Sequence, residues 1–202
     1  TSSLDSSEEA MLKLTVERAQ LQDGMSILEL GCGWGSLTCY MAKKFPDSKI
    51  IAVSNSKDQK EFILKRCEKN NIKNIEVITA DMNDFTIDQT FDRIVSIEMF
   101  EHMRNYKKLF KRISSFLNSQ GKIFIHIFTH KEYAYPFEDK SESDWMAREF
   151  FSGGQMPSHR LLLHFQEDVK IEKIWKVSGE HYSKTSRAWL NKMDSNKKMI
   201  LD

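Results

Sequence analysis

Two glutamates and a histidine lie close together in the segment Ile97–Met103, at Glu98, Glu101 and His102. Residues three and four positions apart share one face of a helix, so a bend from strand to helix here would bring the three side chains together. Such a cluster can attract a cationic amine and remove its proton to expose a lone pair. Because an unperturbed imidazole has a pKa of about 6.5, His102 is the better base. The two carboxylates are better suited to binding and orienting the cation.

A metal ion is the competing use of the same cluster. Glu101 and His102 would then be joined by His126 or His130. The chain lacks HExxH or any other recognised metal-ligand spacing around these residues. We therefore predict no metal site.

A glycine-rich turn is the second chemical feature, with Gly31, Gly33 and Gly35 directly after the apolar run Ile27–Leu30. Glycine adopts positive φ and lets the backbone approach a ligand closely, which a ligand-binding turn after a strand requires. The turn lacks the GxxxxGK[ST] pattern of a P-loop, and Ser36 stands where a dinucleotide fingerprint needs its third glycine. A turn that merely closes a strand–helix unit remains the alternative.

The residues from Glu29 to Gly35, ELGCGWG, resemble motif I of the class I methyltransferases that use S-adenosylmethionine (SAM). The resemblance implies SAM as the cofactor, with its amino-acid part beside the glycines. Glu29 would then attract the ammonium group of SAM, and the helix N-terminus after Gly35 would favour its carboxylate.

Polar side chains follow the next two predicted strands, where a doubly wound sheet binds its ligand. Asn55 and Gln59 follow the second strand and can hydrogen-bond a ribose. Asp81 follows the third strand and can accept the adenine amino group, with Met82 packed on the ring. Capping of a turn or helix is the alternative for Asn55 and Asp81.

The elements that must position these residues follow from the apolar pattern. Strand-like runs cover 25–30, 49–54, 75–79, 91–97 and 122–129, and helical periodicity covers about 6–21, 36–44, 57–69 and 106–117. This alternation predicts an α/β fold: a doubly wound, mostly parallel, Rossmann-like sheet with helices on both faces. The chain 1–202 is then a single SAM-dependent methyltransferase domain.

The alternation of strand-like and helical segments ends after the fifth predicted strand. Residues 131–157 are predicted to form an irregular insertion that acts as a lid, because long loops in compact domains are often binding loops. Beyond the insertion we expect a helix near 158–165, a strand near 169–177 and a helix near 182–193.

A more specific resemblance covers nearly the whole chain. The chain resembles the coclaurine N-methyltransferase family and the related cyclopropane-fatty-acyl-phospholipid synthases. The segments that carry this resemblance are Ile97–Tyr106, Val53–Gln59, Phe151–Pro157, Phe165–Val169 and Ser178–Tyr182. It implies that Glu98, Glu101 and His102 match residues associated with substrate binding and catalysis in the N-methyltransferases. It also implies helices before Thr1 and a final antiparallel strand after Asp202, so we expect an excerpt of a longer chain.

One position departs from this pattern. The resemblance places Ile127 where cyclopropane synthases hold a bicarbonate base with a histidine. His126 is one residue away, and neighbouring strand residues face opposite sides of a sheet. We therefore favour methyl transfer to a small-molecule acceptor, most readily an amine nitrogen. The alternatives are lipid carbon methylation of the cyclopropane-synthase kind and a non-catalytic SAM-binding domain.

The composition of the chain limits the kinds of binding partner that it can have. Thirty Lys and Arg against 29 Asp and Glu leave a net charge of +1, which gives no basic field for nucleic acid. No apolar run is long enough to cross a membrane. A basic stretch over 104–112 leaves peripheral contact with a membrane as an alternative. Three cysteines without CxxC spacing favour free thiols and a cytoplasmic location.

Overall fold

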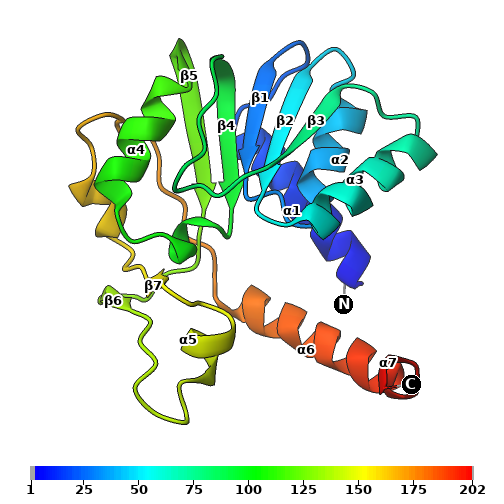
Figure 1. The fold of residues 1–202 in the computed structure, drawn as a ribbon, viewed down its shortest axis with the longest axis vertical. Helices are drawn as coiled ribbons and strands as arrows, with labels where there is room; N and C mark the ends of the chain where they lie inside the picture. The colour runs from blue at the N-terminus through cyan, green and yellow to red at the C-terminus, as the bar shows by residue number, and fades with distance from the viewer. Residues whose placement is uncertain (1–2, 202) are drawn as a thin grey trace.

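The computed structural model describes residues 3–201, and a parallel sheet of five strands forms its centre (Figure 1). The strands lie in the order β3-β2-β1-β4-β5, and every neighbouring pair is parallel. Their bounds are β1 Ser26–Leu30, β2 Lys49–Ser54, β3 Ile75–Thr79, β4 Phe91–Ile97 and β5 Leu117–His126. The chain builds the sheet outward from β1 to β3 and then returns to place β4 on the other side of β1. In doubly wound folds, ligands bind at the carboxyl ends of the two strands on either side of such a switch, here β1 and β4.

Helices cover both faces of the sheet, as the sequence predicts. One face packs on α4 (Tyr106–Ser115) through a core that includes Leu28, Ile94, Phe110 and Ile113. The other face packs on helices α1 (Leu4–Arg18), α2 (Ser36–Lys44) and α3 (Lys57–Lys69). The predicted fold class, a doubly wound parallel sheet, is thereby confirmed.

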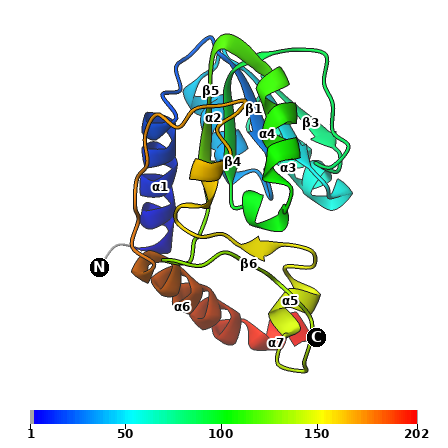
Figure 2. The ribbon, with the colours of Figure 1, turned by 90° about the vertical axis from the view of Figure 1, so that its left-hand side faces the viewer.

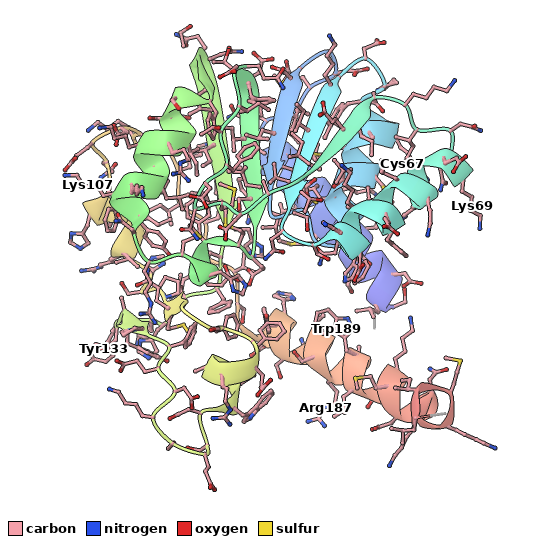
Figure 3. All side chains as sticks on the ribbon, viewed as in Figure 1. Cys67, Lys69, Lys107, Tyr133, Arg187 and Trp189 are labelled. Atoms are coloured by element: carbon pink, nitrogen blue, oxygen red, sulfur yellow. The ribbon has the colours of Figure 1, made fainter. Side chains whose placement is uncertain are left out.

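Most of the remaining elements lie beyond the carboxyl ends of β4 and β5, and one short helix, Leu161–His164, packs beside α4 (Figures 1 and 2). They are η1 (Phe100–His102), β6 (Tyr135–Pro136), α5 (Trp145–Glu149), β7 (Gln155–Met156), η2 (Leu161–His164), α6 (Glu180–Ser195) and α7 (Lys197–Leu201). The insertion 131–157 is irregular apart from α5 and the two-residue pair β6–β7. Helix α6 buries none of its residues, and Figure 3 shows its side chains, among them Trp189 and Arg187, standing clear of the sheet.

The structure corrects the predicted bounds around β5. The strand begins at Leu117 and ends at His126, whereas the sequence predicts 122–129. The polar residues before Lys122 suggest a turn, yet they continue the strand through a register shift opposite Phe91. Gly121 permits this, because a Cβ there would lie 2.8 Å from the carbonyl oxygen of Phe91.

The strand predicted at 169–177 is wrong, and the helix predicted near 158–165 is reduced to the short η2. Side chains of the 169–177 segment do contact β5: Lys122 pairs with Glu172 at 2.6 Å, and the rings of Phe124 and Trp175 lie 6.2 Å apart. A strand also needs backbone hydrogen bonds to a neighbour, and among residues 3–201 the sheet ends at β5. The segment is therefore extended without being paired.

Candidate functional site

The glycine turn between β1 and α2 has positive φ at all three glycines. Gly31 and Gly35 are packing positions, because a Cβ at Gly31 would lie 2.7 Å from Met99 Cβ and one at Gly35 would lie 2.6 Å from Ile63 Cγ1. At Gly33 a Cβ would meet nothing within 4 Å. The outer glycines therefore fix the turn against its neighbours, while Gly33 presents open backbone.

Glu29, at the end of β1, is buried beneath this turn. Its Oε2 accepts a hydrogen bond of 2.6 Å from the Thr38 hydroxyl, which comes from the first turns of α2. Burial raises the pKa of Glu29 to about 8, and the Thr38 hydrogen bond opposes that rise. A carboxyl group in this setting gains strongly from a nearby cation.

A hydrogen bond from Ser54, the last residue of β2, orients the Gln59 side chain on α3. Ser54 Oγ donates to Gln59 Oε1 at 2.5 Å, which leaves the Gln59 amide N–H groups as donors. Asn55 is exposed, and Ser56 rather than Asn55 caps α3 by accepting the Gln59 backbone N–H. The capping alternative for Asn55 therefore does not hold.

The end of β3 uses Asp81 as a turn residue. Its Oδ1 accepts from the Asn83 backbone N–H at 2.7 Å and from the Asn83 side chain at 2.9 Å. Asp81 is exposed, whereas Met82 is buried in the core and its carbonyl accepts from Arg112. Asp81 thus caps a turn, as the alternative interpretation expects, and its second carboxylate oxygen, Oδ2, remains able to accept a hydrogen bond from a ligand.

Glu98 and Glu101 form a carboxyl pair just beyond β4, with Glu98 half-buried and Glu101 buried. Glu98 has a positive φ of 50°, which turns the chain into η1 and directs the two side chains toward each other. Burial, together with the negative charge of Glu101, raises the pKa of Glu98 to about 8, and burial raises the pKa of Glu101 as well. Both shifts favour the protonated form, and the two acids interact closely enough to affect each other's pKa. Among residues 3–201 neither carboxyl group forms an ion pair with a lysine or arginine.

His126, the last residue of β5, lies beside this pair. Its Nδ1 is 3.7 Å from Glu98 Oε1 and has no hydrogen-bond partner in the described structure. The expectation that His126 faces away from the site is therefore wrong. Parallel strands β4 and β5 end together, with Ile97 opposite His126, so the residue after β4 meets the last side chain of β5. That position at a strand end is the signal that sequence reasoning missed.

His102 takes a different direction. Its exposed ring stacks on Phe151 of the insertion, with ring centroids 5.4 Å apart, and burial on that side lowers its pKa. The structure thus brings Glu98 and Glu101 together as predicted and turns His102 toward the insertion. No group of three or more His, Cys, Asp or Glu in 3–201 has the arrangement of a metal site.

A cluster of aromatic side chains, Phe128, Phe137, Phe151 and Tyr182, lies on the side of the acid pair where the insertion and α6 come together, and we call it the aromatic wall. Phe151 contacts the rings of Phe128 and Phe137, and Phe128 contacts Tyr182 of α6. The charges of Glu98 and Glu101 help to raise the pKa of Tyr182, after burial, so this hydroxyl also faces the pair. Apolar rings around buried carboxylates favour an organic cation over a hydrated ion.

The insertion is tied to η1 by backbone contacts. A Cβ at Gly154 would lie 2.5 Å from the carbonyl oxygen of Glu101. Arg104 Nε donates to the Gly154 carbonyl at 3.1 Å, and Gln155 Nε2 donates to the Met103 carbonyl at 2.9 Å. The insertion is therefore anchored beside Glu101.

Comparison with known proteins places this geometry in a family. The model of the family described as mycolic acid cyclopropane synthetase matches residues 1–202. The chain belongs to that family. Its core is the class I methyltransferase fold.

Among curated relatives, (S)-coclaurine N-methyltransferase of Thalictrum flavum subsp. glaucum is 43% identical over 202 residues, which are 99% of this chain and 56% of that enzyme. Pavine N-methyltransferase of the same plant is 41% identical over 198 residues, 97% of this chain and 56% of that enzyme. The cyclopropane-fatty-acyl-phospholipid synthase of Escherichia coli K12 is 32% identical over 188 residues, 92% of this chain and 46% of that enzyme. The chain spans about half the length of these relatives.

A solved structure supports the same placement. The crystal structure of coclaurine N-methyltransferase bound to N-methylheliamine and SAH has a TM-score of 0.92 and 41% identity. The match covers 97% of this chain and 58% of that one. The resemblance predicted from the sequence segments is thereby confirmed.

Proposed function

We propose that this chain carries the catalytic core of a SAM-dependent methyltransferase that acts on an amine nitrogen of a small molecule. One observation carries the proposal: a carboxyl pair without a lysine or arginine partner, Glu98 and Glu101, lies at the end of β4. Met99, between the two acids, packs on Gly31, so the pair adjoins the segment that contacts the glycine turn. The relatives named as N-methyltransferases support the same class of reaction.

The residues around the glycine turn fit SAM as cofactor. Gly33 offers open backbone at positive φ, and the buried carboxyl of Glu29 favours a cation such as the SAM ammonium group. The proposed binding set is Glu29, Gly31, Gly33, Gly35, Asn55, Gln59, Asp81 and Met82. SAM supplies the methyl group, on a sulfonium. These residues would hold the cofactor at the strand ends that also carry the acid pair.

Glu98, Glu101 and His102 form the proposed catalytic set at the acceptor. The single negative charge that the acid pair retains attracts an ammonium ion, and the aromatic rings around it exclude water. His102, stacked on Phe151, borders the acceptor on its solvent side. Alignment of the acceptor with the methyl group then supplies much of the rate enhancement.

One observation favours a second candidate, lipid carbon methylation of the cyclopropane-synthase kind. The sequence argument against it required His126 to face away, and His126 lies at the acid pair. The absence of a cationic side chain beside two buried carboxyls still favours an amine, because a neutral lipid chain leaves the negative charge without a partner.

We also propose a cytoplasmic enzyme with a small-molecule acceptor. Its cysteines Cys32, Cys39 and Cys67 are buried free thiols, which suits a reducing compartment. No helix within residues 3–201 has the length and apolar character to span a membrane.

Methyl-labelled SAM offered to the whole protein tests the proposal. Cyclic secondary amines and vesicles of unsaturated phospholipid are supplied in parallel, and labelled product is separated by solvent extraction. We expect label in the amines. Label in the lipid alone supports the second candidate, and bound SAM without transfer to either acceptor supports a non-catalytic SAM-binding domain.

A further inference from the structure

The acid pair has one contact that methyl transfer from SAM does not by itself explain. Buried Oε2 atoms of Glu98 and Glu101 and the buried Nδ1 of His126 all lack a partner among the described side chains. The raised pKa values of the two acids favour one shared proton, which would serve as the missing donor between the two carboxyls. His126 Nδ1 then remains the one polar atom of the three without a partner, 3.7 Å from Glu98 Oε1.

Glu101 lies deeper than the other two groups. It is only 2% exposed, whereas the side chains of Glu98 and His126 are 28% and 29% exposed. A distance of 3.7 Å is too long for a hydrogen bond, but a small rotation of either side chain closes it. Glu98 and His126 therefore connect the buried Glu101 to the surface.

The other charged groups that face these three side chains come from separate elements. Burial lowers the pKa of His126, and Arg18 of α1 lowers it further. Tyr182 of α6 and Tyr106 of α4 face the acids and remain protonated, because burial and the acid charges raise their pKa values. His126 is therefore neutral at rest and free to accept a proton.

We propose that His126 is the proton acceptor for the amine, reached through Glu98. The inference rests on the proposed function. When an ammonium ion binds, one of its N–H bonds breaks and the proton passes to the acid pair. The proton that the pair already holds leaves Glu98 and forms an N–H bond at His126 Nδ1. The pair carries one proton before and after, the amine gains a free lone pair, and the imidazolium releases its proton to solvent.

This assignment differs from the sequence-based hypothesis that His102 is the base. His102 has no hydrogen bond to either carboxyl among the described contacts and stacks on Phe151. Its place suits contact with the acceptor. His126, by contrast, adjoins Glu98 of the acid pair.

The experiment compares two cyclic secondary amines of the same size on the whole protein. One is strongly basic, and the other carries fluorines beside the nitrogen and is uncharged at neutral pH. We expect His126→Gln to lower kcat for the basic amine by roughly 10²-fold, as for loss of a general base. The fluorinated amine needs no deprotonation before it reacts, so its kcat should fall by less than about threefold.

Further variants separate this role from a structural one. Glu98→Gln, whose amide cannot relay a proton, should reproduce the dependence on amine basicity. The loss in His126→Gln should shrink as the pH rises and more amine is neutral. His164→Gln, on exposed η2, is the matched control and should leave both rates unchanged.

Equal losses on the two amines overturn the relay, as does a basicity-dependent loss in His102→Gln with none in His126→Gln. In both cases wild-type methylation of amines still stands. If the wild-type protein methylates neither amine, the proposed function fails and the relay fails with it.

Discussion

The two halves of the site are built in opposite ways. The cofactor half is local in sequence: Glu29, the three glycines and Thr38 come from the end of β1, one turn and the start of α2. The acceptor half is assembled from the ends of β4 and β5, η1, the insertion and α6, so that Glu98 meets His126, and Phe128 meets Tyr182. Backbone geometry defines the first half, and tertiary packing defines the second.

This difference explains which half can vary. A turn fixed by glycines at positive φ tolerates few changes, because every other residue is strained there. The acceptor half is made of side chains on separate elements, each replaceable without rebuilding the sheet. Relatives with one cofactor and several acceptors follow from such a division.

Gly33→Val should give the largest effect, because the branched side chain would occupy the path of the cofactor. We expect SAM binding to weaken by roughly 10²-fold or more, measured by calorimetry on the whole protein. Gly153→Val is the matched control, since Gly153 has φ 77° and equally open surroundings but lies in the insertion. Equal loss of SAM affinity in both variants would contradict a direct role for Gly33.

Glu101→Gln should act on the acceptor half alone. Removing the charge from a buried, hydrogen-bonded pair should raise the acceptor KM by about 30-fold, with the Kd for SAM unchanged. Glu132→Gln, exposed in the insertion, serves as control. A change in SAM affinity as large as the change in KM would show that the two halves are not separable.

Glu29→Gln tests the cofactor half through stability. In the folded protein Glu29 has a pKa of about 8, against an ordinary value of 4.5. Between these values the native state binds a proton that the unfolded chain has lost, so wild-type stability falls as the pH rises toward 8. The free energy of unfolding of wild type relative to the variant should drop by about 2 kcal/mol or more from pH 5 to 8. Parallel pH profiles from denaturant titrations are the opposing result.

His102→Ala should give the smallest effect. Its ring stacks on Phe151 and borders the acceptor, so we expect about a fivefold rise in acceptor KM and a smaller change in kcat. Steady-state kinetics at fixed, saturating SAM measures both. A fall in kcat of about 10²-fold would return the role of base to His102, as the sequence suggested.

The fold was largely predictable because its signals are local. The bounds of α2 and α3 agree with the predicted 36–44 and 57–69, since an apolar periodicity and flanking strands mark them. The start of β5 was not predictable, because a register shift opposite Phe91 continues the strand through polar residues. The segment 169–177 has the alternation of a strand, but alternation shows an extended backbone and not a hydrogen-bonded neighbour.

The site divides in the same manner. The glycine turn and the Glu98–Glu101 pair follow from spacing within one segment. The orientation of His126 depends on how far β4 and β5 extend relative to each other, which neither strand encodes alone. The stacking of His102 on Phe151 depends on where the insertion returns to η1, a contact across 49 positions of sequence that periodicity does not report.

The close approach at Gly154 has a consequence for protein engineering. One of its two α-hydrogens occupies the position where a side chain would collide with the Glu101 carbonyl. A substitution at Gly154 would therefore separate the insertion from η1 instead of enlarging the acceptor site. Larger acceptors have to be accommodated by trimming the wall itself, at Phe137 or Phe151, while this contact is left intact. The backbone contact between Gly154 and Glu101 should therefore be kept, and the size of the acceptor site should be changed through the aromatic side chains.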